Sequence, residues 1–165
     1  MRIRRAFTLV ELLLALAIIA VTSTAVVAML SAAARTSSVI NAEASTEWEL
    51  DAALRRITQE VRTCAAGSLV VSTDASGNAT FSLVTQPDVN NNAYNVSYAL
   101  ATAADGTRQV VETDPRYGTS VLVHNVQTWD AHLKNLTGPA ILVVSVTAGR
   151  ADAQTSRVFE AAPRN

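Results

Sequence analysis

The segment that most constrains this fold is an uncharged, apolar run near the start of the chain, residues 12–34. A helix rises about 1.5 Å per residue, so this run is about 35 Å long as a helix. That length is enough to cross a hydrocarbon core of about 30 Å. The arginines before the run predict that the N-terminus stays on the cytoplasmic side of a membrane. These leader charges are Arg2, Arg4 and Arg5.

A single acid, Glu11, stands at the start of the apolar run. A bare carboxylate at bilayer depth costs about 3 kcal/mol, and less near the interface, so it needs a partner. In one interpretation Glu11 lies at the interface and reaches toward Arg4, one heptad back on the same helix face. In the other, the chain is cut after Ala6, and Glu11 pairs with the new α-amino group of Phe7 on a neighbouring chain. The two charges would then be neutralised only when subunits assemble in register.

The same residues resemble a known processing signal. The basic leader, the stretch AFTLVEL (6–12) and the apolar run are similar to the class III signal of type IV pilins and type II secretion pseudopilins. This resemblance implies cleavage between Ala6 and Phe7 by prepilin peptidase, N-methylation of Phe7, and a role for Glu11 in subunit assembly. The family usually has glycine before the cut, and Ala6 is similarly small. The motif covers about the first fifth of the chain.

The charge and cysteine content of the chain limit which classes of function and which stabilising bonds are possible. The chain has 13 basic and 14 acidic side chains, and removing the three leader arginines leaves 10 and 14, a net charge of −4. Nucleic-acid binding needs clustered Lys and Arg, so no nucleic-acid partner is expected. Cys64 is the single cysteine, which excludes an intrachain disulfide. The globular part of the chain must therefore be held together by its hydrophobic core and by helix packing.

The helix is expected to continue well beyond the membrane span. No glycine or proline occurs before Gly67, which favours one helix from about Phe7 to about Cys64. Past Arg35 the predicted helix becomes amphipathic. We expect one of its faces to pack on the globular domain that follows it, the head. That face consists of Leu50, Leu54, Ile57 and Val61.

After Gly67 the hydrophobic pattern changes to a period of two, which is typical of strands. The clearest hairpin lies within residues 95–113 and turns at Asp105–Gly106. Residues 120–133 predict one long or two bent strands, and the apolar stretch 140–147 predicts a central strand. About seven strands after one long helix indicate an α+β fold, with the helix on a mostly antiparallel sheet.

The strand-rich head, which ends in Pro163–Arg164–Asn165, is similar to minor pilins of the W kind and minor pseudopilins of the J kind. Both resemblances imply a pilin-like fold. The expected divisions are a leader (1–6), a membrane-spanning and filament-core helix (7–34), an amphipathic helix (35–66) and a β-rich head (67–165).

Few residue combinations suggest chemistry. His124, Asp130 and His132 have even spacings and would share one face of a regular strand, but a metal site needs more ligands. The polar stretch 88–92 begins like a calcium loop, yet the glycine expected next is Ala93 and the position of the bidentate acid holds Ala99. Cys64 is interpreted as a packing residue. The sequence therefore predicts no catalytic residues, no metal and no cofactor.

The leading hypothesis is a structural subunit, a minor pilin or pseudopilin of a type IV pilus or type II secretion pseudopilus. Its expected partners are prepilin peptidase, other subunits, the inner-membrane assembly platform and membrane lipid. We expect it in the bacterial inner membrane with its head outside the cytoplasm, and then in the filament. The alternative is a secreted or membrane-anchored periplasmic protein with unknown binding or hydrolytic activity. Ala32–Ala33–Ala34 resembles an ordinary signal-peptide cleavage site, and an uncleaved anchor is the third possibility.

Overall fold

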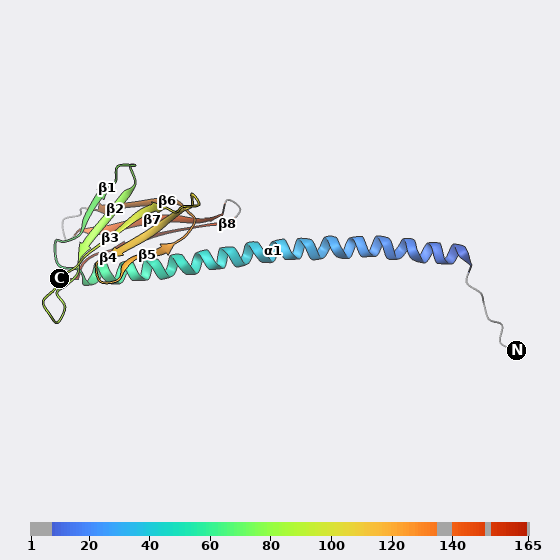
Figure 1. The fold of residues 1–165 in the computed structure, drawn as a ribbon, viewed down its shortest axis with the longest axis horizontal. Helices are drawn as coiled ribbons and strands as arrows, with labels where there is room; N and C mark the ends of the chain where they lie inside the picture. The colour runs from blue at the N-terminus through green and yellow to red at the C-terminus, as the bar shows by residue number, and fades with distance from the viewer. Residues whose placement is uncertain (1–7, 135–139, 151–152, 165) are drawn as a thin grey trace. The chain divides into compact units, whose positions relative to one another are not determined.

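The computed structural model describes residues 8–134, 140–150 and 153–164. Within them the chain forms one helix, α1 (Leu9–Thr63), followed by eight strands (Figure 1). The chain divides into two units, residues 1–40 and 41–165, so the boundary falls inside α1. The α+β arrangement predicted from the sequence is confirmed, with one strand more than expected.

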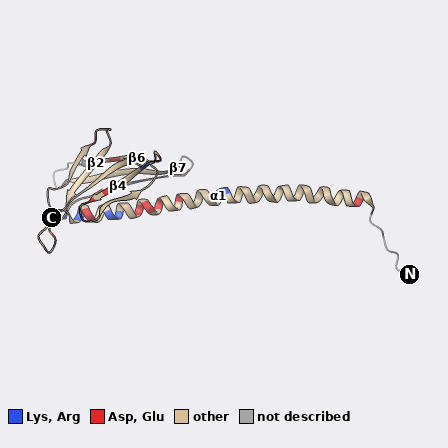
Figure 2. Cartoon of the chain, in the orientation of Figure 1, with Lys and Arg blue, Asp and Glu red and all other residues tan. Residues whose placement is uncertain are grey.

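In the first unit, α1 is apolar on all sides. Its large side chains are exposed, with Leu12 and Leu13 each at 57%. Charged side chains gather instead in the C-terminal part of α1 (Figure 2). A helix that is apolar all round needs lipid or other helices around it. By length and composition, α1 is the one helix among the described residues that could cross a membrane.

Hydroxyl groups inside this apolar stretch bond to the helix itself. The Thr22 hydroxyl donates to the carbonyls of Ile18 (2.9 Å) and Ile19 (3.0 Å), and the Thr24 hydroxyl donates to that of Val21 (2.8 Å). Such bonds satisfy a hydroxyl without a water molecule or a partner helix. The helix continues through these residues without a break.

The second unit contains two antiparallel sheets, each built from strands consecutive in sequence. One sheet has the order β1-β2-β3-β4-β5 and the other β6-β7-β8. The central strand predicted at residues 140–147 is confirmed from residue 141 onward, because these residues form part of β7, which lies between its two neighbours. The strands are β1 (Val70–Thr73), β2 (Ala79–Val84), β3 (Asn95–Thr102), β4 (Arg108–Asp114), β5 (Gly118–Val123), β6 (Val126–Lys134), β7 (Ile141–Arg150) and β8 (Ala153–Ala161).

The turns explain where the predicted strands begin and end. The Asp105–Gly106 turn joins β3 to β4 as expected, with Gly106 at a φ of 84°. Between β5 and β6, Asn125 has a φ of 53°, a left-handed conformation that asparagine tolerates. The chain turns there and passes from the first sheet to the second, so residues 120–133 form parts of two strands in different sheets. The sequence also predicts a turn at Leu136–Pro139, and these residues lie outside the described ones.

The core lies between the two sheets and the C-terminal part of α1. The ring of Phe81 stacks on Tyr98 at 4.5 Å and on Trp129 at 6.1 Å between centroids. The indole of Trp129 donates to the Ala79 carbonyl at 2.7 Å, which ties β6 to β2. From α1 the core receives Leu50, Ala53, Ile57 and Val61, with Leu54 partly buried beside them.

The last turn of α1 is fixed to the head at its end. Cys64 is 1% exposed and forms an isolated bridge with Thr85. The Arg164 amide donates to the Arg62 carbonyl at 3.2 Å, which holds the C-terminal tail beside the helix. Residues 41–63 of α1 are therefore part of the head rather than a free stalk.

Candidate functional site

The start of α1 contains a reciprocal capping arrangement. The Thr8 amide donates to Glu11 Oε2 at 3.0 Å, and the Glu11 amide donates to Thr8 Oγ1 at 3.3 Å. The Thr8 hydroxyl also donates to Glu11 Oε2, at 3.1 Å. This is a capping box, in which two side chains satisfy amides that the first helical turn leaves free. Its Thr-x-x-Glu signal was visible in the sequence and was missed there.

The capping box gives Glu11 a place within its own chain. A carboxylate at a helix N-terminus is also stabilised by the helix dipole. Glu11 therefore lies at the N-terminal end of α1 and not among the apolar side chains at its middle. The leader charges Arg2, Arg4 and Arg5 and the cleavage pair Ala6 and Phe7 lie outside the described residues. Cleavage, methylation and the pairing of Glu11 with an amine therefore stay predictions.

A second concentration of charge lies inside the head, and sequence reasoning did not single it out. Glu112 on β4 is fully buried, and Arg56 of α1 lies with Nε 2.8 Å from its Oε2. The Ser120 hydroxyl from β5 donates to the same oxygen at 3.2 Å. A buried carboxylate costs several kcal/mol unless it is paired and hydrogen-bonded, and Glu112 is both. The pair joins the helix to the sheet.

Asp114, two residues further along β4, has its own cation. It is 1% exposed, and the Arg116 guanidinium donates to both of its oxygens, the shortest contact being 2.7 Å. These hydrogen bonds from Arg116 hold the pKa of Asp114 below its ordinary value. The guanidinium of Arg116 also lies over the rings of Tyr94 (5.1 Å) and Tyr117 (5.2 Å).

Glu60 and Tyr98 complete this cluster. The Tyr98 hydroxyl lies 3.0 Å from Glu60 Oε2 and 3.2 Å from Glu112 Oε1, and its side chain is fully buried. Burial raises the pKa of Glu60, the hydrogen bond from Tyr98 opposes this, and the nearby charge of Glu112 raises it further. Burial and the two neighbouring carboxylates raise the pKa of Tyr98, so its phenol stays protonated.

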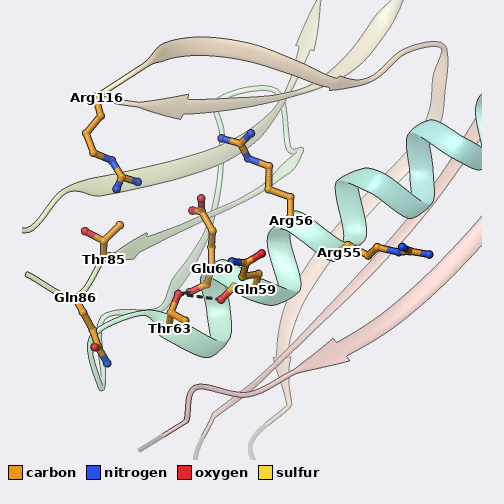
Figure 3. A pocket seen from close by; sticks show the side chains of 8 residues that line it. All are labelled: Arg55, Arg56, Gln59, Glu60, Thr63, Thr85, Gln86 and Arg116. Carbon is orange, nitrogen blue, oxygen red and sulfur yellow. Dashed lines mark hydrogen bonds between the residues drawn. The ribbon is translucent and has the colours of Figure 1, made fainter. Parts of the chain in front are cut away.

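The cluster borders an open cavity of about 580 Å³. Figure 3 shows the Glu60 side chain pointing toward the space between Arg56 and Arg116. Ligand oxygens of Glu60, Glu112 and Asp114 lie within 4.8 Å of one another. Glu112 and Asp114 already have guanidinium partners and Glu60 has a phenol, so a metal ion would have to displace these contacts. In the structure the three carboxylates thus belong to one network of ion pairs and hydrogen bonds.

The histidine grouping predicted from even spacing is wrong. His124 precedes the turn at Asn125 and lies off β6, and its Nδ1 is 3.2 Å from Glu49 of α1. Asp130 and His132 do share one face of β6 and contact each other at 3.0 Å, and both are exposed. The change of sheet at Asn125 interrupts the alternation on which the prediction depended.

The polar loop 88–92 is held by its own first residue. Asp88 Oδ1 accepts hydrogen bonds from the amides of Asn90 (2.8 Å) and Asn92 (2.9 Å), and Asn91 has a φ of 64°. The hydrogen bond from the Asn92 amide, and with a smaller effect that from the Asn90 amide, lower the pKa of Asp88. The Asp88 carboxylate is thus used to shape the turn.

A long apolar helix that starts in a capping box and runs into an antiparallel β head is a pilin-like α+β arrangement, and this helix is long and apolar enough to span a membrane. Residues 1–27 match the family model of the prokaryotic N-terminal methylation motif. The chain thus carries the prepilin-type N-terminus of the type IV pilin and pseudopilin family, as the resemblance in its sequence predicted. Comparisons with curated proteins and with solved structures give no match.

Proposed function

We propose that this protein is a minor pilin or pseudopilin, a structural subunit of a type IV pilus or type II secretion pseudopilus. The observation that carries the proposal is the methylation motif at residues 1–27, which runs directly into an exposed apolar helix. Prepilin peptidase removes residues 1–6 and the new N-terminus at Phe7 is methylated. Proteins of this class are typically structural, and the ion-pair network of the head is consistent with such a role.

The apolar part of α1 is suited to both environments that this function requires, the membrane and the core of the filament. Before assembly, residues 7–34 span the inner membrane, with the leader arginines in the cytoplasm and the head outside it. After assembly, the same side chains pack against the helices of other subunits and leave the lipid. A heterologous contact repeated along a screw axis then generates a fibre.

The chemistry of the mature N-terminus tests this proposal against its alternatives. Mass spectrometry of the protein from its native host should find a chain that begins with methylated Phe7. A chain that begins at Arg35 would indicate an ordinary signal peptide, and one that begins at Met1 would indicate an uncleaved anchor. Either of those results would overturn the proposal.

The capping box allows the role of Glu11 in assembly to be separated into two parts. Glutamine can also serve in a capping box, so Glu11→Gln keeps the cap and removes the charge, whereas Glu11→Val removes both. Thr8→Val removes the hydroxyl that the cap requires and keeps the charge. If the charge pairs with the amine of a neighbouring Phe7, both Glu11 variants should be processed normally and be depleted from sheared filaments, while Thr8→Val is retained.

The control for this comparison is Glu43→Gln, a change at an exposed acid on the same helix. It should be incorporated like the wild type. Normal incorporation of Glu11→Gln together with loss of Glu11→Val would show that Glu11 acts only as a cap. Normal incorporation of both Glu11 variants would show that Glu11 has no role in assembly.

A further inference from the structure

In the charged cluster of the head, two carboxyl groups contact the same phenol, which has a single hydrogen to donate. Tyr98 Oη faces Glu60 Oε2 at 3.0 Å and Glu112 Oε1 at 3.2 Å. A phenol carries a single donor hydrogen, whereas an ionised carboxylate only accepts hydrogen bonds. With both acids ionised, one of the two contacts would bring lone pairs together, in a site that is buried at Glu112 and partly buried at Glu60. A second hydrogen is needed to make both contacts hydrogen bonds.

The other contacts of the two acids indicate where this hydrogen resides. Glu112 has a guanidinium at 2.8 Å and a second donor in the Ser120 hydroxyl, and both favour its ionised form. Glu60 has a side-chain hydrogen bond with Tyr98 alone among the described residues. Arg116, which lies across Glu60 from Arg56 in Figure 3, donates to both carboxylate oxygens of Asp114.

We propose that Glu60, Tyr98 and Glu112 form a proton-binding site that ties the last turns of α1 to β3 and β4. The carboxyl group of Glu60 carries the proton and donates to Tyr98 Oη. The phenol of Tyr98 in turn donates to the Glu112 carboxylate, which Arg56 holds from the helix side. The site takes up one proton when α1 docks on the sheet and releases it when the helix end separates.

The charges that surround Glu60 are consistent with a retained proton. It faces Tyr98 from β3, Glu112 and Asp114 from β4, Arg116 from the β4–β5 turn, and Arg56 from its own helix, while Arg55 lines the same cavity with its side chain pointing away from Glu60 (Figure 3). Two of the nearest groups are acids, and both arginines that neutralise them are already engaged. Burial is the main reason that the pKa of Glu60 lies above its ordinary value of 4.5.

The sign of the effect on stability follows from this direction. A carboxyl whose pKa is raised in the folded protein contributes stability that is complete below 4.5 and is lost as the pH rises through the raised value. The docking of α1 on the sheet should therefore weaken as the surroundings change from acid to neutral. This inference concerns the head alone and does not depend on filament assembly.

The first test is the titration of the glutamate side chains in the full-length protein in detergent micelles. Carbon-13 NMR of the side-chain carboxyl carbons should show one glutamate that stays protonated at pH values at which the other glutamates are already ionised. That resonance should be absent in Glu60→Gln and present in Glu43→Gln. If every glutamate of the wild type titrates in the ordinary range, the proposal fails, whatever the variants do.

The second test is the thermal midpoint of the head as a function of pH. Glutamine at position 60 can donate to Tyr98 Oη without a bound proton, so Glu60→Gln imitates the protonated acid. From pH ~5 to ~8 the midpoint of the wild type and of Glu43→Gln should fall, and that of Glu60→Gln should fall less. Parallel pH profiles for all three proteins would overturn the proposal.

Discussion

The pair formed by Arg56 and Glu112 leads to the sharpest prediction about stability. Arg56→Met keeps a long unbranched side chain on α1 but removes the cation 2.8 Å from a carboxylate that is fully buried. Removing one partner of a buried pair typically costs about 3–5 kcal/mol, because the other charge stays buried without compensation.

Two features of the site reduce this cost. Arg56 is 44% exposed, so water already screens part of the interaction. Glu112 also keeps its contacts with Ser120 and Tyr98. We therefore expect Arg56→Met to lower the free energy of unfolding by about 2–3 kcal/mol. At about 2–4 °C per kcal/mol, the thermal midpoint should fall by about 4–12 °C.

The assay can use the natural tryptophans. Trp129 is 8% exposed and stacks in the core, whereas Trp48 is 71% exposed. A Trp48→Phe background leaves Trp129 as the single tryptophan, because the chain has two. Urea unfolding of the full-length protein in micelles, followed by Trp129 fluorescence, then reports on the head.

Two further variants decide whether the reasoning is right. Arg55→Met changes the adjacent exposed arginine, which has no ion pair with a described residue, and should stay within about 0.5 kcal/mol of the wild type. Adding Glu112→Gln to Arg56→Met removes the unpaired charge and should restore about 1–2 kcal/mol. A cost for Arg56→Met no larger than that for Arg55→Met would refute the argument.

The remaining predictions concern the core and the second ion pair. Trp129→Phe leaves the Ala79 carbonyl without its donor and should lower the free energy of unfolding in urea, followed by circular dichroism because the fluorescent probe is lost, by about 1–3 kcal/mol; an unchanged midpoint would contradict this. Leu50→Ala empties a fully buried site and should cost about 2–5 kcal/mol by the same assay, whereas an equal loss for Ala52→Gly, at an exposed position, would point to helix propensity instead. Because the pKa of Asp114 is lowered, its contribution is present above 3.8 and is lost as the pH falls; Asp114→Asn should therefore flatten the acid side of the stability profile, and an unaltered acid side would exclude this pair.

The local order along the chain was accessible from the sequence for physical reasons. The absence of glycine and proline before Gly67 predicted a single helix, and α1 runs from Leu9 to Thr63. Alternating side chains and the Asp105–Gly106 turn predicted the hairpin of β3 and β4. These signals depend on neighbours in sequence, so they remain valid whatever the rest of the chain does.

The charged cluster of the head could not be found in this way. Its members come from α1, β3 and β4, and Glu60 and Tyr98, which form one of its hydrogen bonds, are 38 positions apart. Glu112 looks like an ordinary strand residue until the sheet is covered by the helix and the residue becomes buried. The same dependence on the assembled fold separated His124 from Asp130 and His132.

The sequence by itself determined the long apolar helix, its prepilin-type start and the strand-rich head, because each is a matter of composition and local spacing. Only the tertiary structure decided that the strands form two sheets and that a tyrosine and three acids meet next to two arginines. Burial and charge pairing depend on which distant segments pack together, and no local pattern in the chain encodes that choice.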